Sequence, residues 1–226
     1  MHFAWLKNFR SLFLADACPL CDRPAEDILC KACHRQLQRC QVAKPAASWQ
    51  GESPLFIWGH YGGVLKRAIA VMKYENKPQI AELLGEELGR VWLNSASILP
   101  KAIVVPLPMN PEKRQKRGFD QAELIARSFC RQTGFSLKSQ GLQRIKDTKP
   151  LFDLNPQERE LMMQDAFALG KDFQKRRPQL PILLVDDICT TGNTLKAGAK
   201  VLVEQGIQVA GIAAIATPNR KLPTNH

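Results

Sequence analysis

The sequence predicts an α/β protein in which a parallel sheet is flanked by helices and preceded by a small cysteine-rich module. Two unbroken apolar runs, residues 102–105 and 182–185, have the pattern of strands that are buried on both faces of a sheet. Each run is followed by polar residues and then by an amphipathic segment, which is the order expected when parallel strands alternate with helices. Two Cys-x-x-Cys pairs near the N-terminus indicate the additional module.

The remaining elements are expected from apolar periodicity and from the glycines and prolines that interrupt it. A helix with Leu65, Ala68, Ile69 and Met72 on one face follows a first strand and a Gly-Gly break. The full expected order is strand 55–61, helix 64–74, helix 80–93, strand 102–106, helix 121–133, strand 166–169, strand 182–185, helix 195–205 and strand 208–216.

The composition of the 226 residues, 45% hydrophobic and 23% charged, is that of a globular protein rather than a disordered one. No apolar run approaches the roughly 20 residues that span a bilayer. Residues 3–13 have the spacing of an amphipathic helix, and the apolar stretch 12–15 is shorter than the ~7 residues of a secretory signal core. We therefore expect a cytoplasmic protein without a transmembrane segment. Its net charge of +11 favours anionic partners, among which polyphosphates, nucleic acid and acidic lipid remain open.

Cys18, Cys21, Cys30 and Cys33 form two knuckles that can supply the four thiolates of a structural zinc site. A redox dithiol and a pair of unligated knuckles are the alternatives. Residues 41–54 are poor in periodic apolar positions, so we expect a domain boundary there. The predicted division is residues 1–50, with the amphipathic helix and the four-cysteine zinc module, and residues 51–226, with the α/β domain.

The strand 182–185 ends in two adjacent carboxylates, Asp186 and Asp187, which are suited to accept hydrogen bonds from sugar hydroxyls. A short polar turn then leads into the next helix, where free backbone N–H groups and the helix dipole favour a phosphate. That turn contains Thr190, Thr191, Gly192, Asn193 and Thr194. The segment therefore predicts a site for ribose 5-phosphate, and the alternative is an ordinary buried strand before a capped helix.

A second cluster of charge follows the strand 102–106. Lys113, Arg114 and Arg117 lie in a basic loop between a proline-rich turn and the helix 121–133, which suits a pyrophosphate. A merely solvated basic loop is the alternative. Arg144 opens a long polar stretch, residues 144–159, which is either a lid over the site or an inert excursion.

The segment 182–195 resembles the signature of the type I phosphoribosyltransferases, which bind phosphoribosyl pyrophosphate. Together with the cysteine knuckles, Lys73-Tyr74, residues 105–108, Arg117-Gly-Phe119 and Thr148-Lys-Pro150, the chain resembles the ComF family from Cys18 to about Thr217. The resemblance implies a zinc-finger module before a type I phosphoribosyltransferase-like parallel sheet, and in some members an association with DNA uptake during natural competence. The chain departs from the family pattern at Asp120, Leu151 and Met162, on the acceptor side and the lid.

If the domain is an active transferase, the resemblance implies displacement of pyrophosphate from C1 of the ribose, with magnesium on the leaving group. In that reading Asp186, Asp187 and Arg144 are the catalytic residues. The competing hypothesis is a non-catalytic protein that uses the phosphoribosyl pocket for binding or sensing, contacts single-stranded DNA and meets other proteins of the competence machinery. A zinc-dependent transcription factor is a third hypothesis. The sequence does not name the acceptor.

Overall fold

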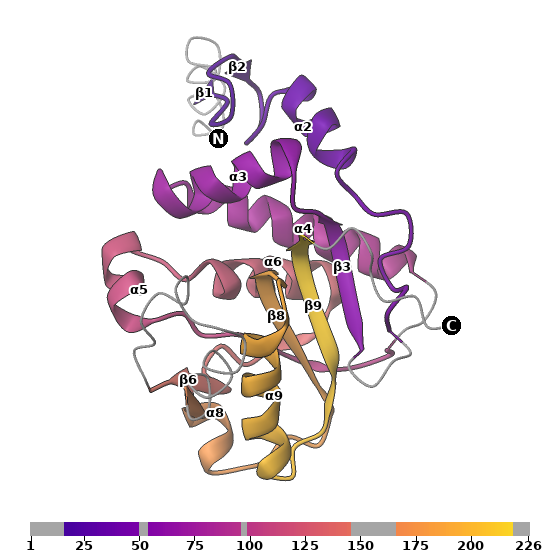
Figure 1. Ribbon diagram of the computed structural model, residues 1–226, viewed down its shortest axis with the longest axis vertical. Coiled ribbons are helices and arrows are strands. Elements are labelled where there is room, and N and C mark those ends of the chain that lie inside the picture. Colours follow the sequence, from indigo (N-terminus) through magenta and orange to yellow (C-terminus); the bar gives the residue numbers. More distant parts are fainter. Residues whose placement is uncertain (1–15, 50–53, 96–98, 146–165, 219–226) are drawn as a thin grey trace, which may run out of the picture.

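The computed structural model describes residues 16–49, 54–95, 99–145 and 166–218 (Figure 1). The elements, in chain order, are β1 (Asp16–Ala17), β2 (Pro24–Ala25), α2 (Lys31–Gln38), β3 (Leu55–His60), α3 (Gly63–Tyr74), α4 (Pro78–Asn94), β4 (Ile103–Pro106), α5 (Pro111–Arg117), α6 (Gln121–Thr133), β5 (Ser136–Leu137), β6 (Leu142–Arg144), β7 (Phe167–Leu169), α8 (Lys171–Gln174), β8 (Ile182–Ile188), α9 (Asn193–Glu204) and β9 (Val209–Thr217). The helix predicted over residues 3–13 and most of the predicted lid lie outside the described residues. Within the described ranges, no helix is long and apolar enough to cross a bilayer.

The main sheet has five strands in the order β3-β9-β8-β4-β5, and every neighbouring pair is parallel. At its centre, Leu183 of β8 pairs with Val104 on one side and with Gly211 on the other. Both apolar runs singled out in the sequence are therefore interior strands. The prediction of an α/β fold with a parallel sheet flanked by helices is confirmed.

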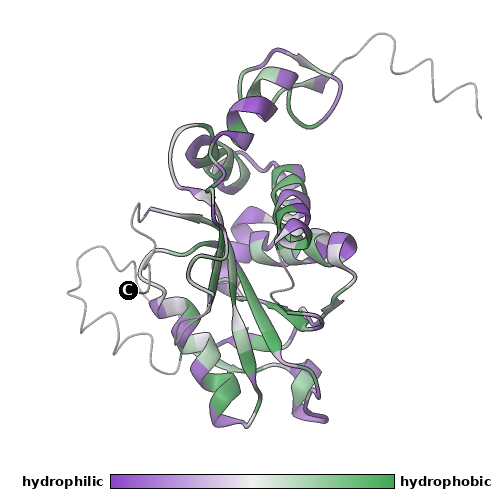
Figure 2. Cartoon of the chain, turned by 90° about the vertical axis from the view of Figure 1, so that its right-hand side faces the viewer, coloured by the Kyte–Doolittle hydropathy of each residue, from purple (hydrophilic) through white to green (hydrophobic). Residues whose placement is uncertain are grey.

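Alternate residues of each central strand face opposite sides of the sheet, which produces two apolar cores. Leu183 and Val185 face α3, α4 and α6, whereas Ile182 and Leu184 face α9 and the β6–β7 ribbon. The strands at the centre are apolar over most of their length, while polar residues lie on the outer faces of the helices (Figure 2). Burial of the sheet on both faces explains why its strands read as continuous apolar runs.

The segment that contains Lys113, Arg114 and Arg117 is a short helix, α5, and not the loop that we predicted. Asn110 caps it by accepting a hydrogen bond from the backbone N–H of Lys113, and Pro111 occupies the first turn. Gly118 ends it in a left-handed conformation, with φ of +80°. These end signals define a helix of polar residues, which apolar periodicity does not detect.

The cysteine-rich segment forms a β1–β2 ribbon followed by α2, and it lies over α3 and α4 at the top of the view in Figure 1. Its apolar residues continue into the core on the α3–α4 side of the sheet. The chain that leaves α2 runs beside β3, where isolated bridges join Gln41 to Gly59 and Ser48 to Leu55. The division of the chain near residue 50 stays a prediction.

Candidate functional site

The candidate site lies at the point where the connections of the sheet change sides. β4 and β8 are neighbours, with Pro106 paired to Val185. The chain that leaves β4 continues to α6 on one face, whereas the chain that leaves β8 continues to α9 on the other. The two connections diverge at the carboxyl ends of the strands, and a crevice at such a divergence is where open α/β sheets bind ligands.

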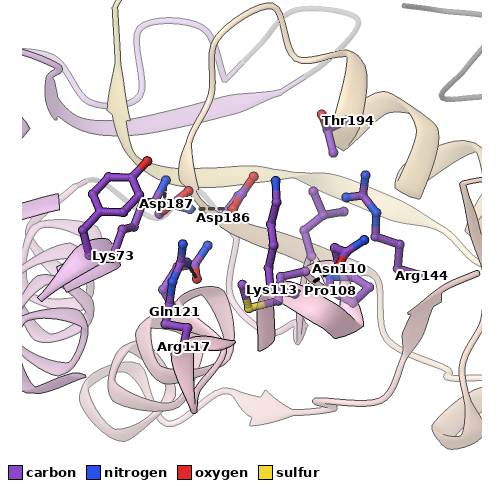
Figure 3. A pocket seen from close by; sticks show the side chains of 13 residues that line it. Lys73, Pro108, Asn110, Lys113, Arg117, Gln121, Arg144, Asp186, Asp187 and Thr194 are labelled. Atoms are coloured by element: carbon purple, nitrogen blue, oxygen red, sulfur yellow. Dashed lines mark hydrogen bonds and ion pairs between the residues drawn. The ribbon is translucent and has the colours of Figure 1, made fainter. Parts of the chain in front are cut away.

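A cavity of about 260 Å³ opens at this crevice (Figure 3). Its walls come from the end of α3, the loop after β4, α5, the start of α6, the end of β6, the end of β8 and the start of α9. The lining residues are Lys73, Tyr74, Leu107, Pro108, Met109, Asn110, Lys113, Arg117, Gln121, Arg144, Asp186, Asp187 and Thr194. Segments that are distant in sequence thus place charged or hydrogen-bonding groups around one space.

The acid pair sits at the floor of this cavity. Asp187 is almost fully buried, and its Oδ2 lies 2.6 Å from Nζ of Lys73. Its backbone N–H donates to Oδ1 of Asp186 over 2.8 Å, which fixes the first carboxylate against the second. Burial raises the pKa of Asp186 well above its ordinary value, the charge of Asp187 adds to this, and the ammonium of Lys73 opposes it. Lys73 therefore pairs with Asp187, and both aspartates line the cavity.

The turn after the acid pair leads directly into α9 through a left-handed glycine. Gly192 caps α9 with φ of +76°, a left-handed value that strains any residue with a Cβ. Thr194 lines the cavity, whereas Thr190 and Thr191 are exposed on the outside of the turn. The Thr191 hydroxyl accepts a hydrogen bond from the backbone N–H of Asn193 at 3.5 Å. Hence Thr194 and the acid pair line the same space, whereas Thr190 and Thr191 do not.

Cys189 precedes this turn and is buried. Burial raises the pKa of its thiol to about 11, so it is protonated and unreactive at neutral pH. Cys189 is therefore a small packing residue.

The predicted cations divide between two cavities. Lys113 and Arg117 line the cavity beside the acid pair, and Arg117 contacts Gln121. Arg114 is directed away, because its guanidinium forms an ion pair of 3.0 Å with Glu123. It lines a second cavity of about 300 Å³ on the other side of the loop after β4. One side of the basic helix therefore faces the candidate site, and the other side contacts α6.

Arg144 lies at the end of β6, and it lines both cavities. Its guanidinium carbon is 5.4 Å from the centroid of the Phe167 ring, a cation–π distance that orients the side chain from the neighbouring strand. Figure 3 shows it beyond the acid pair on the side away from Lys73. The stretch predicted as a lid begins directly after this strand.

Sequence reasoning missed four polar lining residues: Lys73, Tyr74, Asn110 and Gln121. Lys73 and Tyr74 end a helix whose apolar face accounts for the rest of its pattern, so only their position in the ComF resemblance marked them. Asn110 carried a usable signal, since an Asn-Pro pair before a polar segment indicates a capped helix start. Gln121, too, was marked only by its position in the ComF resemblance.

The four cysteines form the second candidate site. The Sγ atoms of Cys18, Cys21, Cys30 and Cys33 all lie within 4.8 Å of one another, and those of Cys21 and Cys30 are 3.6 Å apart. A tetrahedral zinc ion with Zn–S bonds of about 2.3 Å needs sulfurs about 3.8 Å apart. Arg23 donates to Sγ of Cys21 over 3.4 Å, and this hydrogen bond lowers the pKa of the Cys21 thiol to about 6. The donor set and its spacing fit a metal ion.

The comparisons with known proteins agree with the position of the first site. The phosphoribosyl transferase domain model matches residues 177–224, which contain the acid pair, α9 and β9. Competence protein F of Haemophilus influenzae is 28% identical to the chain, over 84% of the chain and 91% of the relative. Competence protein ComFC of Bacillus subtilis is 24% identical over 84% of the chain and 72% of the relative. These similarities support a ComF-family protein.

Two further similarities extend this comparison. DNA utilization protein YhgH of Salmonella typhimurium is 26% identical to the chain, over 84% of the chain and 78% of the relative. Among solved structures, adenine phosphoribosyl transferase of Trypanosoma brucei aligns over 86% of the chain and 85% of its own, with 10% identity and a TM-score of 0.39.

Proposed function

We propose that the cavity at the end of β8 binds phosphoribosyl pyrophosphate, and that the protein is a phosphoribosyltransferase of the pentosyltransferase class. The observation that carries the proposal is the meeting of Asp186, Asp187 and Thr194 with three cations, Lys113, Arg117 and Arg144, in one cavity. The fold supports it, because the phosphoribosyl transferase domain model covers the acid pair and its turn.

Each group has a role in this proposal. The carboxylates of Asp186 and Asp187 accept hydrogen bonds from the ribose hydroxyls, and the N–H groups and hydroxyls of residues 190–194 hold the 5-phosphate. Lys113 and Arg117 bind the pyrophosphate as it leaves C1, and Arg114 joins them by leaving Glu123. The sugar becomes cationic as its bond to pyrophosphate breaks, and the adjacent carboxylates stabilise that charge. Arg144, at the start of the predicted lid, helps to exclude water.

Magnesium fits this site mainly through its ligand. Asp186 supplies a carboxylate that faces the cavity, while Asp187 is engaged by Lys73, so the oxygens of phosphoribosyl pyrophosphate provide most of the coordination. When bound, the ion neutralises charge on the leaving pyrophosphate.

Zinc fits the cysteine cluster, which would be a structural site. Four sulfurs at tetrahedral spacing leave no position for a reacting ligand. The β1–β2 ribbon and α2 are short, so the metal would supply much of the stability of this segment.

A role in DNA uptake or DNA use is suggested by the names of the relatives, competence protein F and DNA utilization protein YhgH. The net charge of +11 is compatible with single-stranded DNA as a partner. The second candidate function is therefore a non-catalytic competence protein that uses the phosphoribosyl pocket for binding or sensing. Contacts with competence machinery proteins belong to either candidate.

Calorimetry with phosphoribosyl pyrophosphate and magnesium tests the site. The double variant Asp186→Asn, Asp187→Asn should lose binding while its circular dichroism spectrum stays that of the parent. Unchanged affinity in the double variant would refute the proposal. A control variant, Asp172→Asn, changes a half-buried carboxylate on α8 that accepts from the backbone N–H of Gln140 and does not line the cavity, and it should bind as the parent does.

Release of pyrophosphate separates the two candidate functions. A transferase releases pyrophosphate from phosphoribosyl pyrophosphate when one of a panel of nucleobases and small amines is added. A binder retains phosphoribosyl pyrophosphate intact with every compound of the panel. Retention of single-stranded DNA at low salt, lost as salt is raised, would support the role in competence for the same preparation.

A further inference from the structure

The ion pair between Lys73 and Asp187 is the starting point. Nζ of Lys73 lies 2.6 Å from Oδ2 of Asp187, and the two side chains are 19% and 6% exposed. Both residues line the cavity, so this pair belongs to the binding surface. The side chain of Lys73 reaches the acid pair from α3. This helix contains none of the sequence motifs that predicted the phosphate and sugar sites.

The acid pair poses an electrostatic problem for the proposed ligand. Ribose 5-phosphate carries up to two negative charges at neutral pH, and its hydroxyls must approach two adjacent carboxylates that are held together by the hydrogen bond from Asp187 N–H to Asp186. Like charges in a partly buried site repel strongly. Binding therefore requires a cation close to the carboxylates, supplied either by the solution or by the protein.

Lys73 is the cation that forms an ion pair with the acid pair, through Asp187. The other cations that line the cavity approach from different elements. Figure 3 shows Lys73 at one side of Asp187, Lys113 beside Asp186 on the other side, Arg144 beyond it, and Arg117 below the pair. Within the described part of the chain, the ion pair made by Asp186 or Asp187 is the one with Lys73. Lys73 is thus the lysine that serves the carboxylates.

The fold holds Lys73 in this position before any ligand arrives. Buried Leu65, Ile69 and Met72 anchor α3 to the sheet. The start of the helix is fixed as well, since the backbone N–H of Tyr61 donates to Thr217 O at the end of β9 over 2.8 Å. A cation on such a helix needs little reorganisation when the ligand enters.

We infer that Lys73 is the built-in counter-cation of the sugar site: it neutralises Asp187, so that the acid pair accepts a phosphorylated ribose without a divalent metal ion at the carboxylates. The inference rests on the proposed function and assigns to Lys73 a positioning role within it. Magnesium then serves the pyrophosphate of the full ligand rather than the sugar.

Binding of ribose 5-phosphate, which has no pyrophosphate, tests the inference. Titrations with the full chain are run in EDTA and in magnesium, on the parent and on Lys73→Met. The parent should bind with affinities that agree within about threefold in the two buffers. Lys73→Met should lose at least about tenfold in EDTA and regain most of the loss in magnesium, because the metal replaces the missing charge. Lys66→Met, which removes an exposed lysine from the same helix, is the charge-matched control and should behave as the parent.

Two further variants protect the test from a folding defect. Lys73→Gln keeps a hydrogen-bond donor near Asp187 without its charge and should share the metal dependence of Lys73→Met. Lys73→Arg keeps the charge and should restore binding in EDTA. The inference is overturned if the neutral variants bind ribose 5-phosphate as the parent does in both buffers, and the proposed function then stands. Failure of the parent to bind either ribose 5-phosphate or phosphoribosyl pyrophosphate would overturn the proposed function itself.

Discussion

His34, which directly follows the last cysteine of the cluster, places its Nε2 3.4 Å from Oε1 of Glu87 on α4. Glu87 is buried, and its other oxygen contacts Arg90. The contact ties the cysteine-rich segment to a helix that packs on the main sheet. A buried carboxylate needs hydrogen-bond partners. The contact between His34 and Glu87 therefore fixes how the cysteine-rich segment lies on α4.

Replacement of His34 by alanine should therefore lower the free energy of unfolding by about 0.5–1.5 kcal/mol, because Glu87 then keeps only one of its two partners. The midpoint of urea unfolding, measured with metal bound, reports the change. His60→Ala is the control, since its side chain is exposed at the end of β3. Equal midpoints for both variants and the parent would show that the contact between His34 and Glu87 does not contribute to the free energy of unfolding.

The cysteine cluster makes a prediction about metal content. The parent should contain about one zinc per chain, and Cys21→Ser should lose it, because three thiolates and a hydroxyl bind zinc far more weakly than four thiolates. Cys40→Ser is the matched control, since Cys40 lies outside the cluster and donates to the carbonyls of Gln36 and Gly62. Elemental analysis measures both. A folded parent that contains no metal would favour the redox alternative.

Gly192 allows the backbone conformation of the phosphate turn to be tested separately from its side chains. Gly192→Ala should lower the free energy of unfolding by about 1–2 kcal/mol, because φ of +76° is unfavourable for alanine. Relief of that strain rotates the N–H groups at the start of α9, so affinity for ribose 5-phosphate should fall as well.

Gly134→Ala is the matched control for this strain. Gly134 has φ of +74° at the end of α6, with no atom near its missing Cβ, so its variant should lose similar stability and keep its affinity. Thermal unfolding and calorimetry measure the two effects. Equal affinities in the two variants would contradict a role for the turn in holding phosphate.

The sequence was sufficient to predict those elements and sites whose residue pattern is local. The run 182–185 and the acids after it predicted the central strand, and the cysteine spacing predicted a cluster whose sulfurs do meet. Lys73 could not be found this way, because its partner Asp187 is 114 residues away and nothing in the helix pattern distinguishes it from a solvated lysine. The same holds for Gly85, where an added Cβ would lie 2.3 Å from the carbonyl oxygen of Ile125 on α6. Contacts between elements depend on the tertiary arrangement, which a single sequence does not contain.

Asp186 connects stability to pH with a definite sign. Its pKa in the folded protein is raised, mainly by burial, so the folded state holds the proton more tightly than the unfolded state does. Below the unfolded value, about 3.9, both states are protonated and the buried carboxyl is neutral, so no stability is lost. As the pH rises from there through the folded pKa, Asp186 ionises in its half-buried site and the protein loses stability.

Asp186→Asn mimics the protonated form, and it should therefore raise the melting temperature at pH 8 by more than at pH 5. In a chain of this length each kcal/mol corresponds to about 2–4 °C, so a gain of a few degrees is expected at pH 8. The variant should also bind ribose 5-phosphate more weakly, because an amide accepts fewer hydrogen bonds from the sugar than a carboxylate does. Melting curves between pH 5 and pH 8 measure the first effect and calorimetry the second. A melting-temperature difference that stays constant or shrinks toward pH 8 would contradict the raised pKa of Asp186. A gain that grows toward pH 8, together with weaker binding, would show that this carboxylate is retained for its ligand at the expense of stability.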